Sequence, residues 1–257
     1  MGASEEPVFV GVDWSGERWL AVAFDRSGFD HAAVVEEIGA LWSRYEERAE
    51  RVLVAVPVGL VESGDAEREC DRLARAVLGP RSEAVFTPPV REATRKRRYP
   101  AAKRVNERKS GQPLSKRAFA MSDAITQVDQ LLQNVPEARP VVRESHPEVC
   151  FRAFAGEPLE YAKGTAGGYA ERMRTLAGYD RDAPPAVQAA AEAAAGHEVR
   201  VDDVLDAVAL AYTARPGDGT LRSLPADPST DSDGLAMEMV YRAPDLLAVP
   251  NGADTEN

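Results

Sequence analysis

Four carboxylates occur in apolar segments, where burying a charge is costly unless it has an ion-pair partner or a functional role. Asp13 ends the first apolar run of the chain, and Glu144 ends a later, shorter one. A charge at the end of a buried strand normally lies at the rim of a sheet. Asp203 and Asp206 are three residues apart in an apolar segment, so a helix would place both on one face.

Together these four residues form a candidate metal site. Carboxylate oxygens are hard ligands that suit Mg²⁺ or Mn²⁺. A pair of such ions would activate a water molecule and stabilise the leaving oxygen of a phosphodiester. The simpler interpretation of Asp13 is a turn-forming residue, and N-capping by Asp202 would explain Asp203 but not Asp206.

Two further segments contain side chains that could take part in a reaction or bind a ligand. His146 precedes Pro147, which is favoured at a first helical position, so it would either shuttle a proton or cap that helix. Lys163 and the glycines up to Gly168 superficially resemble a phosphate-binding loop. The order of the lysine and the glycines is wrong for one, and we reject that interpretation.

Alternating strands and helices must position these residues. Apolar runs and helical periodicity predict strands over 8–13, 19–24, 29–35, 51–57 and 139–144, with the fourth central and parallel to the first. They predict helices over 36–51, 65–78, 115–135, 171–176, 186–195 and 201–212, one beginning near 147, and an edge strand over 235–241.

The segment Arg91–Arg117 inverts the charge of the chain locally. It holds eleven basic and two acidic residues in a protein of net charge −11. Charge runs are usually solvated helical faces, but in so acidic a chain a contact surface for phosphates is favoured. The candidate nucleic-acid contacts are Arg91, Arg95, Lys96, Arg97, Arg98, Lys103, Arg104 and Lys116.

Composition sets the remaining bounds. The 257 residues suffice for one large domain or two small ones, and the net acidity argues against a general nucleic-acid-coating protein. The scarcity of Lys beside abundant Asp, Glu and Ala is typical of a salt-adapted host. No apolar run could cross a membrane and no signal peptide is recognisable, which predicts a cytoplasmic protein with two reduced cysteines.

The ordered set of motifs resembles domain-of-unknown-function family 429, predicted nucleases of the RNase H-like superfold. The matching segments are Gly11–Asp13, Pro57–Leu60, Val85–Pro89, Gly111–Lys116, Glu144–Glu148 and Asp202–Ala207. The resemblance implies an α/β fold, an RNase H-like mixed five-stranded sheet with helices on both faces and carboxylates converging at one rim. It implies a single domain over about 7–242 with a basic helical insertion at about 91–117. The composition of the chain beyond Arg215 predicts a disordered tail over 243–257.

One position departs from the family's pattern. Ala55 stands where the fourth strand usually carries an Asp two residues before the Pro, which removes an expected metal ligand. The leading hypothesis is a nuclease dependent on Mg²⁺ or Mn²⁺, with Asp13, Glu144, Asp203 and Asp206 as ligands. A nucleic-acid-binding module that has lost catalysis is the alternative, and a nucleotide-binding protein is the third. The sequence leaves the form of the nucleic acid and the oligomeric state open.

Overall fold

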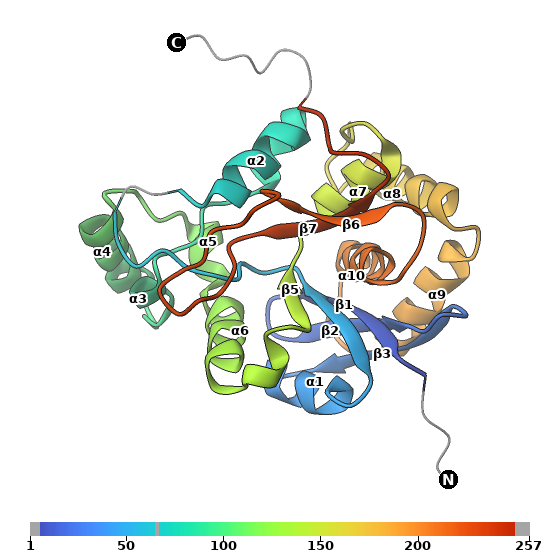
Figure 1. The fold of residues 1–257 in the computed structure, drawn as a ribbon, viewed down its shortest axis with the longest axis horizontal. Coiled ribbons are helices and arrows are strands. Elements are labelled where there is room, and N and C mark those ends of the chain that lie inside the picture. Colours follow the sequence, from blue (N-terminus) through green and yellow to red (C-terminus); the bar gives the residue numbers. More distant parts are fainter. Residues whose placement is uncertain (1–5, 65–66, 250–257) are drawn as a thin grey trace.

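Five strands form the central sheet of the computed structural model, which describes residues 6–64 and 67–249. Their order across the sheet is β3-β2-β1-β4-β5 (Figure 1). The strands β1, β2 and β3 pair antiparallel, whereas β4 and β5 run parallel to β1. The predicted α/β class is confirmed, and the arrangement is consistent with an RNase H-like fold. The bounds are β1 Val8–Trp14, β2 Trp19–Phe24, β3 Phe29–Val35, β4 Ala49–Val54 and β5 Val142–Glu144.

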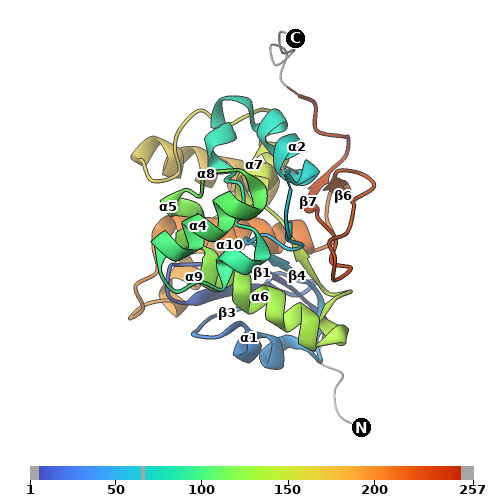
Figure 2. The same ribbon diagram turned by 90° about the vertical axis from the view of Figure 1, so that its left-hand side faces the viewer.

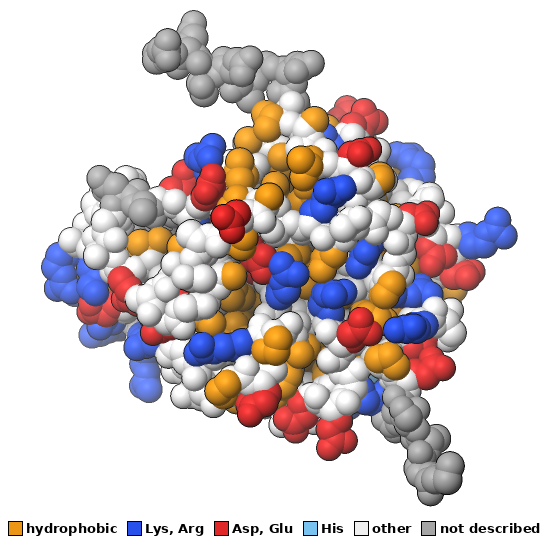
Figure 3. Space-filling view, viewed as in Figure 1, with side chains coloured by type: hydrophobic (Ala, Val, Ile, Leu, Met, Phe, Trp, Pro, Cys, Tyr) orange, Lys and Arg blue, Asp and Glu red, His pale blue; other side chains and the backbone are white. Residues whose placement is uncertain are grey.

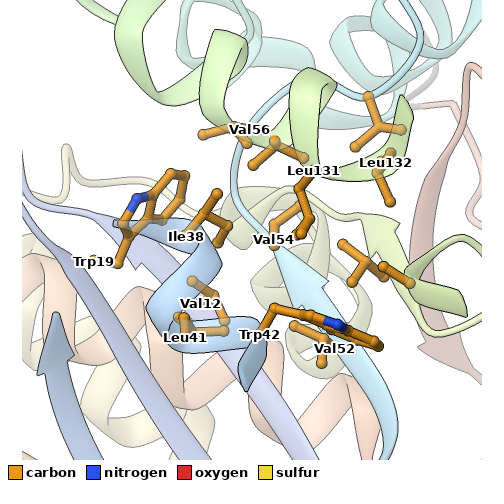
Figure 4. Packing of buried hydrophobic residues seen from close by; sticks show 14 of the residues in the cluster. Val12, Trp19, Ile38, Leu41, Trp42, Val52, Val54, Val56, Leu131 and Leu132 are labelled. Carbon is orange, nitrogen blue, oxygen red and sulfur yellow. The ribbon is translucent and has the colours of Figure 1, made fainter. Parts of the chain in front are cut away.

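Helices cover both faces of this sheet. One face packs against α1 (Ile38–Tyr45) and α6 (Ser122–Asn134), where Val12 and Val54 meet Leu41 and Leu131 (Figure 4). The other face packs against α7 (Pro147–Ala155), α8 (Ala166–Tyr179), α9 (Ala183–Ala193) and α10 (Val201–Ala214). Because successive side chains of a strand point to opposite faces, β1 sends Phe9 toward α10 and Val10 toward α1.

The predicted basic insertion is helical and lies to one side of the sheet (Figures 1 and 2). The bounds of its helices are α3 Arg91–Thr94, α4 Tyr99–Ser110 and α5 Lys116–Ala120. The single helix predicted over 115–135 was wrong, because the backbone of Met121, with φ −84° and ψ −4°, separates α5 from α6. The helix α2 (Glu69–Leu78) precedes the insertion and begins four residues later than predicted, with 65–66 outside the described residues.

Other boundaries also differ from the sequence predictions. The helix predicted over 36–51 ends at Tyr45, because Ala49 already pairs with Val8 as the start of β4. The predicted edge strand does not join the five-stranded sheet: β7 (Met239–Ala243) pairs with β6 (Thr220–Leu224), a strand that the sequence did not predict. Two 3-10 helices, Gly79–Ala84 and Pro136–Ala138, complete the described elements.

The first residues of the predicted disordered tail contact the body of the protein. Arg152 on α7 donates to the Ala248 carbonyl at 3.2 Å, and Leu247 packs near the second sheet. The remainder of that prediction, 250–257, lies outside the described residues. Over the ranges that the structure describes, no helix is long and apolar enough to cross a membrane.

A very close backbone contact joins β1 to α10. A Cβ atom built on Gly11 would lie 2.1 Å from the Ala207 carbonyl oxygen and 2.3 Å from the Ala211 nitrogen. These are backbone atoms, so no side-chain rotation could relieve the overlap. The absence of a side chain at position 11 therefore allows the helix to lie directly on the strand.

We predict that Gly11→Ala destabilises the protein by about 3 kcal/mol or more, because α10 must move away from β1. Urea unfolding of the two proteins measures this loss. Gly39 in α1 is the matched control, since nothing lies within 4 Å of a Cβ atom there. Gly39→Ala is expected to stabilise by about 0.5–1 kcal/mol. Equal effects of the two substitutions would contradict the close-packing argument.

Candidate active site

Two of the predicted carboxylates meet in a cavity at the carboxyl end of β1. Asp13 leaves β1 on the same face as Gly11, and Asp206 precedes Ala207 at the crossing point of α10. Both side chains are buried and line a cavity of about 220 Å³. Strand alternation and the Gly11 contact thus bring together residues that are far apart in the sequence.

Lys163, which belongs to the segment rejected as a phosphate-binding loop, lines the same cavity. Lys163 Nζ is 2.5 Å from Asp206 Oδ2 and 3.8 Å from Asp202 Oδ2. The charges of Asp206 and Asp13 raise the pKa of Lys163, so it is a cation at neutral pH. The order of lysine and glycines in this segment does not match a phosphate-binding loop, so that motif gave no reason to select Lys163. The feature that could have drawn attention to Lys163 is the rarity of lysine, since only five lysines occur in the chain.

The two buried aspartates have perturbed protonation. Burial raises the pKa of Asp13 well above its usual value, and the charge of Asp206 raises it further. Burial raises the pKa of Asp206 to about 6, against the opposing effect of Lys163. Asp206 Oδ1 has no hydrogen-bond partner although it is buried. An unsatisfied buried carboxylate oxygen calls for an explanation, and a bound cation would supply one.

The Glu144 carboxylate is occupied by hydrogen bonds from Arg68 and the backbone. Arg68 binds both of its carboxylate oxygens, at 2.8 and 2.9 Å, and the Val58 N–H donates to it at 2.6 Å. Glu144 pairs across β4 with Val54, so by alternation it leaves the sheet on the α1 face, opposite to Asp13. It lines the same cavity, but the structure does not support it as a ligand shared with Asp13.

The remaining aspartates of α10 have separate roles. The Arg200 N–H donates to Asp203 Oδ2 at 3.1 Å, so Asp203, not Asp202, closes the first turn of the helix. Asp202 instead forms a two-pronged ion pair with the Arg200 guanidinium, at 2.7 and 2.9 Å. Asp203 makes no ion pair in the described ranges and lines the cavity, so its outer oxygen remains available.

His146 caps a helix. Its Nδ1 accepts a hydrogen bond from the Glu148 N–H at 3.2 Å, in keeping with the simpler of the two predicted roles. Burial lowers the pKa of His146 to about 4, and the Lys163 charge lowers it further. The imidazole is therefore neutral at neutral pH, with Nδ1 as acceptor. It is not poised to exchange a proton near pH 7, as a general base would be.

Glu148 and Arg172 form a buried pair that the sequence did not reveal. The fully buried Arg172 donates to Glu148 Oε1 at 2.5 Å, whereas the buried Glu148 Oε2 has no hydrogen-bond partner. The helix dipole accounts for a Glu in the first turn of α7. It gives no indication of a partner on α8, because that pairing depends on tertiary contact.

Ala55 lies beside Asp13, immediately after the end of β4. The Ala55 N–H donates to the Val12 carbonyl at 2.9 Å, continuing the parallel pairing of β1 and β4. Ala55 lines the cavity with a methyl group in place of a carboxylate. The β4 side of Asp13 therefore offers no second anionic ligand.

The donor set is compatible with a hard divalent cation bound with its substrate. Within residues 6–64 and 67–249 no three His, Cys, Asp or Glu side chains converge on one point as a complete metal cage. Mg²⁺ seldom needs such a cage, because it keeps several waters and is held by one or two carboxylates plus substrate phosphates. Asp13 and Asp206, with the unpartnered Oδ1, are the residues that would hold it.

The basic insertion divides into paired and unpaired cations. Arg91, a predicted nucleic-acid contact, is buried among Glu62, Asp129, Asp231 and Asp233, so that prediction was wrong. Others share carboxylates on the insertion or next to it, namely Arg95 with Asp129, Lys96 with Glu92 and Lys103 with Glu107.

Four predicted contacts remain available. Arg97, Arg98, Arg104 and Lys116 are exposed and make no ion pair with any described residue. Basic side chains gather over α4 at the left-hand edge of the molecule in Figure 3. Arg117, which was not among the predicted contacts, lies at the cavity and donates to the carbonyls of Glu83 and Ala84 at 2.8 Å each. Cations thus extend from the cavity toward the insertion.

Fold and site together define an α/β protein with a carboxylate-lined cavity at the end of its central strand. The chain matches the family described as protein of unknown function DUF429 over residues 11–230, and it belongs to that family. Comparison with curated proteins and with solved structures gave no match.

We predict that the metal-free protein loses stability from about pH 4 to about pH 6. The folded state binds the Asp206 proton more tightly than the unfolded chain does, so this contribution is present below about pH 4 and lost above about pH 6. Asp206→Asn removes the titration. Its stability relative to wild type should rise by about 2 kcal/mol between about pH 4 and about pH 7. Urea unfolding in EDTA measures this, and a pH-independent difference would contradict it.

Proposed function

We propose that this protein is a divalent-metal-dependent hydrolase of nucleic-acid phosphodiesters. The observation that carries the proposal is the buried pair Asp13 and Asp206, held in one cavity by β1 and α10 with a carboxylate oxygen left unpartnered. Hard oxygen ligands at the end of a central strand suit Mg²⁺ or Mn²⁺. When bound, such an ion would polarise a phosphoryl oxygen and lower the pKa of a water molecule.

The side chains around this pair fit a phosphodiester substrate. Lys163 and Arg117 place positive charge in and beside the cavity, where an anionic phosphate would enter. His146, neutral and fixed by its cap, borders the cavity without competing for the cation. The exposed cations of the basic insertion lie beyond the cavity and would contact the phosphates of a longer chain.

A binding protein without catalysis is the second candidate. Ala55 and the engagement of Glu144 by Arg68 favour it, because each removes a carboxylate from the expected ligand set. The two candidates share the basic surface and differ only in the cavity. Substitutions at the two places therefore separate them.

Asp13→Asn should lower Mn²⁺-dependent cleavage of a labelled oligonucleotide by about 100-fold or more, because a carboxylate ligand is lost. Binding of the same oligonucleotide in EDTA should stay within about twofold of wild type. The exposed Asp227 supplies the control, and Asp227→Asn should cleave normally. Wild type that binds but never cleaves with Mn²⁺ or Mg²⁺ would leave the binding protein as the function.

Replacing Arg97, Arg98 and Arg104 together with Gln should weaken oligonucleotide binding and make its log–log salt slope less negative by about two units. The matched control replaces three exposed arginines near the opposite end of the molecule, Arg26, Arg174 and Arg181. Fluorescence anisotropy over a salt series measures both slopes. The same change in both triple variants would mean that net charge alone, not the basic insertion, attracts the nucleic acid.

A further inference from the structure

The carboxylates around the cavity are mostly neutralised by the protein itself. Three carboxylates that line the cavity each form an ion pair with one basic side chain. These pairs are Glu83 with Arg81, Glu148 with Arg172, and Asp206 with Lys163. Glu144 shares Arg68 with Asp71. Asp13 and Asp203 are the cavity-lining carboxylates without an ion pair among the described residues. The charge left uncompensated by these two aspartates equals that of one divalent ion.

A second ion would have to lie on the α10 side of Asp13. On the β4 side stands Ala55, and Glu144 beyond it faces the other side of the sheet and is held by Arg68. On the α10 side, one position adjoins both Asp206 Oδ2 and Asp202 Oδ2, the second of which Arg200 also holds at 2.7 Å. Lys163 Nζ already lies there, at 2.5 and 3.8 Å from these two oxygens.

The loop that carries Lys163 is fixed at that position. The Ala162 carbonyl accepts hydrogen bonds from Thr165 N and Oγ1, and Thr165 Oγ1 caps α8 through the Gly168 N–H. A Cβ atom on Gly168 would lie 2.0 Å from the Ala162 oxygen, so loop and helix are in direct contact. Arg172 also donates to the Tyr161 carbonyl at 3.1 Å. The backbone on both sides of Lys163 is therefore held by the fold, and Asp206 holds the ammonium.

We infer that the Lys163 ammonium takes the place of a second metal ion, so that the cavity holds one divalent cation beside a built-in monovalent one. This inference rests on the proposed metal-dependent function and specifies its stoichiometry. The ion binds through Asp13 and the unpartnered Asp206 Oδ1, while Lys163 keeps Asp206 Oδ2. With a phosphodiester bound, Lys163 is the cation left to neutralise an oxygen that a second ion would otherwise contact.

Isothermal titration calorimetry with Mn²⁺ tests this count. Wild type should bind one ion per chain, and Lys163→Gln should bind two, because Asp206 Oδ2 loses its cation and becomes free to contact a second ion. Electron paramagnetic resonance should show isolated Mn²⁺ in wild type and a spin-coupled pair in Lys163→Gln. The control is Lys109→Gln, since Lys109 pairs with Glu92 on the insertion, and this variant should bind one ion.

The variant Lys163→Gln/Asp206→Asn covers the case in which Lys163→Gln does not fold without metal. It removes the cation and its carboxylate together, so the second ion should not bind and the count should not exceed one. Two ions in wild type, or one unchanged ion in Lys163→Gln, would overturn the inference and leave the proposed function standing. Absence of Mn²⁺ binding in both wild type and Lys163→Gln would instead overturn the proposed function.

Discussion

The contact of α10 with β1 at Gly11 determines the geometry of the whole site. Two backbones touch there, so the position of Asp206 relative to Asp13 is fixed by steric packing rather than by attraction between side chains. This matters because the two carboxylates repel each other and are both buried. Left to their own electrostatics they would separate. The fold keeps them together at a cost that burial of the surrounding apolar helices offsets.

Strand alternation then assigns different tasks to carboxylates that look alike in the sequence. Asp13 and Glu144 each end a strand of the same sheet, but the register through Val54 sends them to opposite faces. Asp13 faces the α10 side and makes no ion pair with the described residues. Glu144 meets Arg68 and becomes part of the internal framework. A difference of one residue in register would exchange these roles.

The sequence predicted the parts of the structure that depend on local pattern. The apolar run of β1, the parallel partner β4 and the final helix all follow from periodicity. What it could not predict were the partners of charged groups. Arg68 reaches Glu144 across 76 residues, and Arg91 reaches Asp231 across 140. Such pairings depend on tertiary contact, so Arg91 resembled an exposed cation although it is buried.

The burial of Arg91 has a consequence for the reach of the basic insertion. Its guanidinium joins the first turn of α3 to Asp129 on α6 and to Asp231 and Asp233 in the segment before β7. Bonds to these two separate parts of the chain hold the insertion in a fixed position. The basic insertion therefore keeps its exposed cations at a set distance from the cavity. The span between the cavity and the outer cations is then constant, and under the proposed function a nucleic acid shorter than that span would contact one end of the surface only.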